Sequence, residues 1–307
     1  MFNSVLTLLA SAYAGFRRDQ GAMMAGHLAF LGLLSLFPFF VFFTAVAGQL
    51  GSADDVQRTI ELFLSYLPPE VADVLRKPIK DVIAGAPKGI LTVTAVIALW
   101  TASSGLDAAR LAVRRAFHWS RVQPALKRRL ESTAIAALAP LLLIAAMSIQ
   151  VIGPALWKLF GGEALIGAGV YSLWKALQIF VTPTMLFGIL FVIYFVLSPT
   201  RIRPIALAPG ALCAAIMWLA SANGLSIYLR NLGDYESTYG NLAGTMVTLL
   251  FFFFLGIGFV FGAEVNAAAT VRRRGGDLGT LTDPSAPDPQ VAPDAQAMPD
   301  AAAQDAL

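Results

Sequence analysis

Ionisable side chains interrupt three apolar stretches of the chain, where they could bind a polar solute or an ion. His27 lies near the start of one stretch, Asp107 near the end of another, and Glu264 near the end of the last, "LLFFFFLGIGFVFGAEVNAAATVRRR". A carboxylate left unpaired in hydrocarbon costs about 3 kcal/mol on insertion scales. Glu264 must therefore face a polar partner, and we expect Arg110, His27 or a water-filled cavity that opens to the cytoplasm.

Helical spacing adds further polar residues to this group. Ser103 and Ser104 precede Asp107 by four and three residues, and Arg110 follows it by three, which makes one polar stripe on a helix. Ser35 shares a helix face with His27 in the same way. We predict that the set lines a pathway for a substrate or an ion: His27, Ser35, Ser103, Ser104, Asp107, Arg110 and Glu264.

A structural role is the alternative for the two acids. Asp107 would then only pair with Arg110 or Arg114 of its own helix, and Glu264 would only reach the membrane interface near Arg272. The sequence has two histidines and one cysteine, with no metal-ligand spacing and no recognisable nucleophile–base pair. We therefore expect no metal, no cofactor and no enzymatic activity.

The composition predicts that an all-α, polytopic membrane protein positions these residues. Of the 307 residues, 57% are hydrophobic and 13% are charged, whereas about a quarter are charged in soluble domains. Apolar runs of about 20 residues recur, and each is long enough to cross a bilayer core of about 30 Å. We predict six transmembrane helices in a domain of residues 23–270, at 23–48, 89–113, 132–157, 174–197, 205–229 and 242–269.

Three further segments complete the expected organisation. Residues 1–22 carry their basic side chains after the apolar part, the wrong polarity for a signal peptide, so we expect a retained interfacial amphipathic helix. Residues 49–88 should form an outer loop of short surface helices, with Pro78 ending or kinking the second one. Residues 271–307 carry six Asp and no Lys or Arg after Gly275, which predicts a disordered acidic tail.

The distribution of basic residues predicts the orientation of the chain. With the N-terminus inside, fourteen of the 22 Lys and Arg lie on the inner side and eight on the outer side, as the positive-inside rule requires. Both termini should then be cytoplasmic. The inner loop 114–131, "RRAFHWSRVQPALKRRLE", is expected to bind anionic lipid headgroups, so that membrane lipids and not nucleic acid are the predicted partners.

The last span carries a packing motif opposite its carboxylate. Gly258 and Gly262 form a GxxxG pair, which is typical of close helix–helix contact. Glu264 lies about 200° around the helix from Gly262, so both faces need protein neighbours and this helix should be central. A homo-oligomer through the glycines stays open. Pro38 and Pro183 remove backbone hydrogen bonds inside predicted spans and are candidate hinges.

Three stretches resemble the YihY/BrkB family of bacterial inner-membrane proteins. They are "GHLAFLGLLSLFPFF" in the first span, "LWTASSGLDAARLAVRRAF" in the second and "YGNLAGTMVTLLFFFFLGIGFVFGAEVNAA" in the sixth, and their order and spacing carry the resemblance over residues 17–270. Phe30 departs from the tyrosine that is frequent there. The resemblance implies a multi-pass protein of the bacterial cytoplasmic (inner) membrane, described as a transporter or a virulence-associated envelope protein, with a former ribonuclease BN label.

Two functions stay open at this point. The polar residues, the prolines and the lack of a sizeable soluble domain favour a transporter or exporter of a small polar solute or a lipid headgroup. The alternative is a non-catalytic envelope-integrity or scaffold membrane protein that holds partners through its glycine surface and its basic loop. Ribonuclease chemistry is not favoured, because phosphodiester hydrolysis needs a metal site or an acid–base pair in water-accessible protein.

Overall fold

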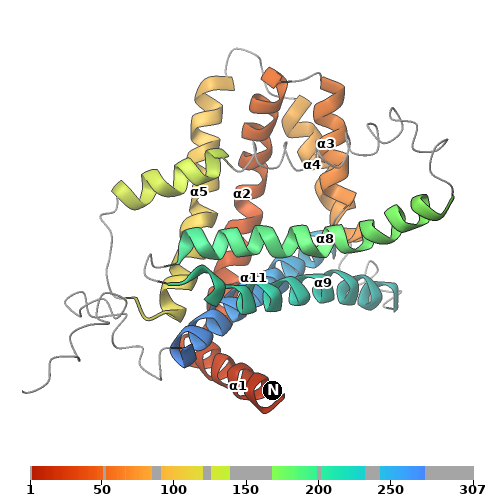
Figure 1. The fold of residues 1–307 in the computed structure, drawn as a ribbon. Helices are drawn as coiled ribbons and strands as arrows, with labels where there is room; N and C mark the ends of the chain where they lie inside the picture. The colour runs from red at the N-terminus through yellow and green to blue at the C-terminus, as the bar shows by residue number, and fades with distance from the viewer. Residues whose placement is uncertain are drawn as a thin grey trace, which may run out of the picture.

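Every regular element of the described chain is helical, as the composition predicts. The computed structural model describes residues 2–50, 53–65, 67–84, 91–119, 126–138, 168–198, 202–231 and 243–273. Figure 1 shows α1 (Phe2–Arg18), α2 (Gly21–Leu50), α3 (Ala53–Ser65), α4 (Pro69–Ala84), α5 (Leu91–Ala116), α8 (Ala168–Leu197), η1 (Pro204–Ala206), α9 (Ala208–Asn231) and α11 (Ala243–Arg273). A further helix covers residues 126–138. Most of the predicted third span and the predicted acidic tail lie outside the described residues.

Helices α2 and α5 stand side by side and carry most of the predicted site (Figure 1). Small side chains allow this approach: a methyl group on Gly105 of α5 would lie 3.0 Å from the Ser35 hydroxyl of α2. Ala108 and Ala112, farther along α5, are buried. The contact therefore places the polar stripe of α5 beside the start of α2, where His27 lies.

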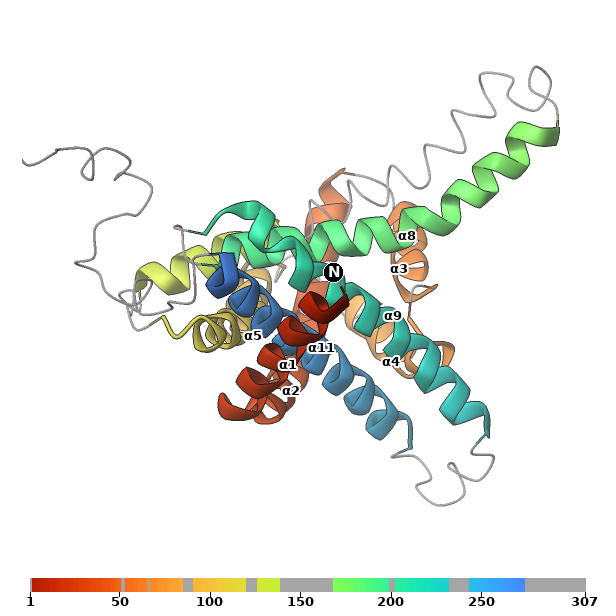
Figure 2. The same cartoon turned by 60° about the horizontal axis from the view of Figure 1, so that its bottom comes forward.

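Helix α11 packs against α9, α2 and the N-terminal helix α1. Its glycines permit these contacts, since a methyl group on Gly256 would lie 2.6 Å from the Ala25 carbonyl oxygen of α2. On the α9 side, the Trp218 indole donates a 2.8 Å hydrogen bond to the Leu255 carbonyl. Figure 2 shows α11 running beside α1 and α2. This helix is central, as expected from its two opposed faces.

The two helices predicted in the 49–88 loop form, but they pack on the helical core. Their apolar faces bury Ile60, Leu64 and Leu75 against Phe40 of α2 and Phe251 of α11. The burial of this apolar surface stabilises the helices in place. They cover one end of α2, and the candidate site lies at the other end.

Pro78 does not end α4, which continues to Ala84. The prediction that Pro78 ends this helix is therefore wrong, and its alternative, a kink at Pro78, stays a prediction. Leu75 and Ile79, on either side of the proline, are 2% and 0% exposed. Their burial in the core holds the last turn of α4 in a helical conformation despite the missing donor.

Helices α8 and α9 run beside each other and across the α2–α5 pair (Figure 1). Pro183 lies inside α8 and Pro38 inside α2, and both helices continue through their proline; the hinge role stays a prediction. Three helices of the described chain are long and apolar enough to cross a membrane: Gly21–Phe43, Pro204–Tyr228 and Ala243–Arg273. A shorter apolar segment covers Pro183–Leu197.

Candidate functional site

Four residues of the predicted pathway line one cavity at the end of the α2–α5 pair. The cavity has a volume of about 280 Å³ and is lined by His27 of α2 and by Ser104, Asp107 and Arg110 of α5. The 126–138 helix contributes Arg128 and Arg129 to the same lining. The arrangement places a carboxylate, an imidazole and several guanidinium groups around a space of the size of a small ligand.

Asp107 is paired with the 126–138 helix. Its carboxylate accepts a 2.9 Å hydrogen bond from Arg129 Nη1 and a 2.5 Å hydrogen bond from the Ser132 hydroxyl. Arg129 also donates to the Trp100 carbonyl at 2.6 Å, and its guanidinium lies 4.4 Å from the centre of the Trp100 ring. The alternative in which Asp107 only pairs with Arg110 or Arg114 of its own helix is wrong, because the neighbouring helix presents a better-placed arginine.

Arg110 also binds the 126–138 helix. Its guanidinium forms a 2.9 Å ion pair with Glu131 Oε2, although Arg110 itself is only 7% exposed. The two ion pairs therefore join Asp107 and Arg110, on successive turns of α5, to one turn of the 126–138 helix. Sequence reasoning assigned Arg129 and Glu131 to a lipid-binding loop, and only the i,i+3 spacing of Arg129 from Ser132 could have suggested a shared helical face.

Two serines of the predicted pathway are satisfied within their own helices. Ser103 is buried and donates a 2.7 Å hydrogen bond to the Trp100 carbonyl. Ser35 donates a 3.0 Å hydrogen bond to the Gly32 carbonyl. Neither residue belongs to the lining of the cavity around Asp107, so the structure does not bring them together with the other four.

Glu264 lies in a second cavity, which has a volume of about 520 Å³ between α1 and α11. The residue is 3% exposed, and the charges of Asp19 and Arg18 act on its carboxyl group. Gly15 of α1 makes room for it, because a methyl group there would overlap Glu264 Oε2. The predicted partners Arg110 and His27 are therefore wrong, whereas the third alternative, a cavity, is present.

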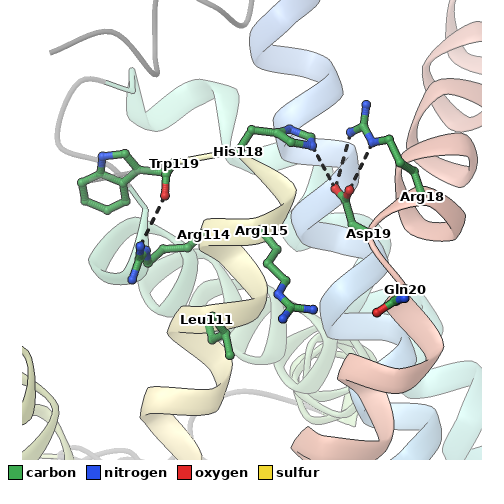
Figure 3. A pocket seen from close by; sticks show the side chains of 8 residues that line it. All are labelled: Arg18, Asp19, Gln20, Leu111, Arg114, Arg115, His118 and Trp119. Carbon is green, nitrogen blue, oxygen red and sulfur yellow. Dashed lines mark hydrogen bonds and ion pairs between the residues drawn. The ribbon is translucent and has the colours of Figure 1, made fainter. Parts of the chain in front are cut away.

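Asp19 is the centre of this second cluster, and sequence reasoning missed it. Its carboxylate accepts a 3.1 Å hydrogen bond from Arg18 Nε and lies 3.3 Å from His118 Nε2 (Figure 3). The hydrogen bond to Asp19 raises the pKa of Arg18 above its usual range. Asp19 lies in the turn between α1 and α2, where Gln20 has a φ of 58°. A short polar turn gives little sequence signal for such a role.

The end of α5 positions His118 toward Asp19. His118 has a φ of 49°, and its N–H donates to the Arg115 carbonyl while the Trp119 N–H donates to the Arg114 carbonyl. This pair of bonds is the Schellman motif, which usually has glycine at the left-handed position. A histidine rarely adopts this left-handed backbone conformation, and residues held in such conformations are often found at functional sites.

A third cavity links these two clusters. It has a volume of about 440 Å³ and is lined by Arg18, Asp19, Arg114, Arg115 and His118, among others (Figure 3). Arg114 also lines the cavity around Asp107, and Arg18 also lines the cavity around Glu264. Asp107 and Glu264 thus lie in different cavities that are neighbours at one end of the molecule.

The packing glycines of α11 lie against other helices of the same chain. A methyl group on Gly258 would lie 2.9 Å from Trp218 of α9, and one on Gly262 would lie 2.7 Å from the Gly210 carbonyl oxygen. Asn266, one turn on, accepts a 2.8 Å hydrogen bond from the Gly210 N–H. The glycine surface is therefore occupied inside the chain.

Among the residues that the structure describes, no group of three or more His, Cys, Asp or Glu side chains is arranged to hold a metal ion.

Comparison with known proteins places the chain in a family. A family model described as "Virulence factor BrkB" matches residues 12–285, which include α2 to α11. The chain belongs to the BrkB virulence-factor family. The match therefore extends over helices α2 to α11 and over the cavities around Asp107 and Asp19, whereas the cavity around Glu264 is lined in part by α1 residues that precede it.

Individual relatives are similar over most of their length. The BrkB-family chain is 25% identical over 272 residues to the Bacillus subtilis (strain 168) protein named "Putative ribonuclease-like protein YfkH", covering 88% of this chain and 97% of the relative. It is 25% identical to a UPF0761 membrane protein of Aeromonas salmonicida (strain A449), covering 83% and 86%. A UPF0761 membrane protein of Alteromonas mediterranea is 26% identical, covering 87% and 90%. No solved structure shows a significant match. These names and the apolar helices identify a membrane protein.

Proposed function

We propose that the chain is a transporter or exporter that moves a small polar solute or a lipid headgroup across the bacterial inner membrane. The proposal includes six transmembrane helices, both termini in the cytoplasm and anionic lipid headgroups as partners on that side. The observation that carries it is the cavity in which His27 of α2 meets Ser104, Asp107 and Arg110 of α5. A polar cavity of this kind within a helical membrane protein is a candidate substrate site.

The ion pairs around the cavity connect two helices that could move apart during transport. Asp107–Arg129 and Arg110–Glu131 join α5 to the 126–138 helix through charged atoms at 2.9 Å. A charged or polar substrate could exchange with these partners, since each new hydrogen bond would replace one that is lost. The 126–138 helix would then separate from α5 when substrate enters.

Reconstitution of the full chain in liposomes tests the proposal. Two liposome preparations are used. The first contains a fluorescent phosphatidylglycerol, and chemical quenching follows the movement of this lipid between the leaflets. The second measures the uptake of radiolabelled inorganic phosphate. Asp107→Asn should lose the movement of the probe that the wild type transports. Asp73→Asn is the matched control, because its side chain is 69% exposed on α4. Wild-type flux in Asp107→Asn, or flux of neither probe in the wild type, would contradict the proposal.

A scaffold or envelope-integrity role is the second candidate, and one observation favours it. Both α5 charges of the cavity, Asp107 and Arg110, have a partner on the 126–138 helix, so they could serve only to join helices. The hypothesis that the scaffold holds its partners through the glycine surface is less favoured, because Gly258 and Gly262 contact α9 within the chain. If Asp107→Asn kept wild-type function in cells, transport through this cavity would not be needed and the scaffold role would be favoured.

The proposal includes no catalysis. The name of the Bacillus relative suggests ribonuclease-like chemistry, and the only His–carboxylate ion pair in the described part of the chain is His118–Asp19. Asp19, however, is also bound by Arg18. Among the described residues, no serine, threonine or cysteine that could act as a nucleophile lines the cavity that contains the pair.

A further inference from the structure

The cavity around Asp107 has more positive than negative groups in its lining. Four arginines line it, together with a single carboxylate and His27: Arg110, Arg114, Arg128 and Arg129. The Asp107 carboxylate already accepts hydrogen bonds from Arg129 and Ser132. Arg110 has Glu131 as its acidic partner. The charges of Arg114 and Arg128 remain to be balanced.

Among the described residues, no carboxylate forms an ion pair with Arg114 or Arg128. Arg114 donates a long hydrogen bond, 3.4 Å, to the Trp119 carbonyl. The Nε atoms of both arginines are buried from solvent and have no hydrogen-bond partner in the described part of the chain. A buried, unsatisfied donor on a charged group is costly, so a ligand that accepted these hydrogen bonds would be favoured.

The two arginines come from different helices and act on each other. Arg114 belongs to the last turn of α5 and Arg128 to the first turn of the 126–138 helix. The positive charges of Arg128 and Arg110 both repel that of Arg114. An anion placed between Arg114 and Arg128 would replace this repulsion by two attractions.

We propose that Arg114 and Arg128, with His27 in the same cavity, form a binding site for a phosphate-type oxyanion. Planar guanidinium groups match the geometry of phosphate oxygens and bind them through paired hydrogen bonds. A cavity of about 280 Å³ lies near the lower end of the range for small-ligand sites, which fits an ion or a headgroup. The site deepens the proposed transport function and rests on it for its role: the anion is the polar group that the transporter admits.

Binding to the purified full chain in detergent tests this site without any measurement of flux. Isothermal titration calorimetry in phosphate-free buffer uses two probes: inorganic phosphate, and a short-chain phosphatidic acid compared with the corresponding phosphatidylcholine. Arg114→Gln and Arg128→Gln should each weaken binding about tenfold or more, because each removes a charge-assisted hydrogen-bond donor. Lys77→Gln is the control, since Lys77 is an exposed lysine of α4 outside the lining of the cavity, and this variant should bind as the wild type does.

The two probes distinguish the source of the anion. Binding of inorganic phosphate, with loss in both glutamine variants, supports a soluble ion, whereas binding of phosphatidic acid alone supports a lipid headgroup. Arg114→Lys keeps the charge without the planar fork, so it should show an intermediate loss and provides a second variant if Arg114→Gln does not fold. Saturable binding of neither probe, or wild-type affinity in both glutamine variants, would overturn the site. Binding with no flux would instead reject only the transport proposal.

Discussion

Replacing Gly210 by alanine should separate α9 from α11. A methyl group on Gly210 would overlap the backbone carbonyl oxygen of Gly262 and the side-chain amide of Asn266. The carbonyl belongs to the α11 helix and cannot rotate away, so the two helices must move apart. The same change would stretch the 2.8 Å hydrogen bond from the Gly210 N–H to Asn266 Oδ1.

The expected destabilisation follows from these two losses. Overpacking a tight contact costs about 1–3 kcal/mol, and the loss of a buried hydrogen bond costs about 1 kcal/mol more. The better helix propensity of alanine returns at most about 1 kcal/mol. The free energy of unfolding of Gly210→Ala should therefore be lower than that of the wild type by about 1–3 kcal/mol.

Gly224 provides a control on the same helix. A methyl group there would meet no described atom within 4 Å, so Gly224→Ala should leave stability unchanged or raise it by up to about 1 kcal/mol. Both variants would be unfolded by titration with dodecyl sulfate in mixed micelles and followed by circular dichroism. If Gly210→Ala unfolded at the same denaturant fraction as Gly224→Ala, the close contact between α9 and α11 would be refuted.

Three further changes test contacts elsewhere in the molecule. Tyr194→Phe should lower the free energy of unfolding by about 1 kcal/mol, because the buried hydroxyl donates a 2.6 Å hydrogen bond to an α11 carbonyl; the same titration measures it. Arg129→Gln should increase amide hydrogen exchange in the 126–138 helix, because Asp107 loses its 2.9 Å ion pair to that helix. The Lys80 hydrogen bond holds the pKa of Glu61 below its ordinary value of 4.5, so this carboxylate contributes stability above pH 4.5 that is lost as the pH falls through the lowered pKa. Lys80→Ala should therefore be less stable than the wild type at neutral pH, and the difference should vanish in acid, as measured by thermal unfolding against pH.

Each of these changes has a control at a residue of the same type or the same charge that lacks the contact. Tyr228→Phe alters a tyrosine that is 48% exposed and should not change stability. Lys127→Gln removes a cation from the same helix as Arg129 and should leave exchange unchanged. Lys77→Ala removes an exposed lysine of α4 and should show no loss at neutral pH. Equal effects of a variant and its control would refute the corresponding contact.

The all-helical, apolar character of the chain could be read from its sequence, because it depends on composition and on the spacing of apolar residues along single helices. The two opposed faces of α11 could also be read from the sequence. Counting residues around one helix places Gly262 and Glu264 on nearly opposite faces, and in the structure Gly262 contacts α9 while Glu264 faces α1. These properties are local and need no knowledge of the neighbours.

The partners of the charged groups could be known only from the tertiary structure. Several arginines lie near the same end of the molecule, and periodicity cannot choose among them. Asp107 binds Arg129 and not Arg110 because the 126–138 helix packs against α5. Glu264 meets Asp19 because α1 crosses the end of α11 and Gly15 leaves space for the carboxylate. Charge pairing depends on distances between separate helices, and those distances are fixed by packing and not by spacing along the chain.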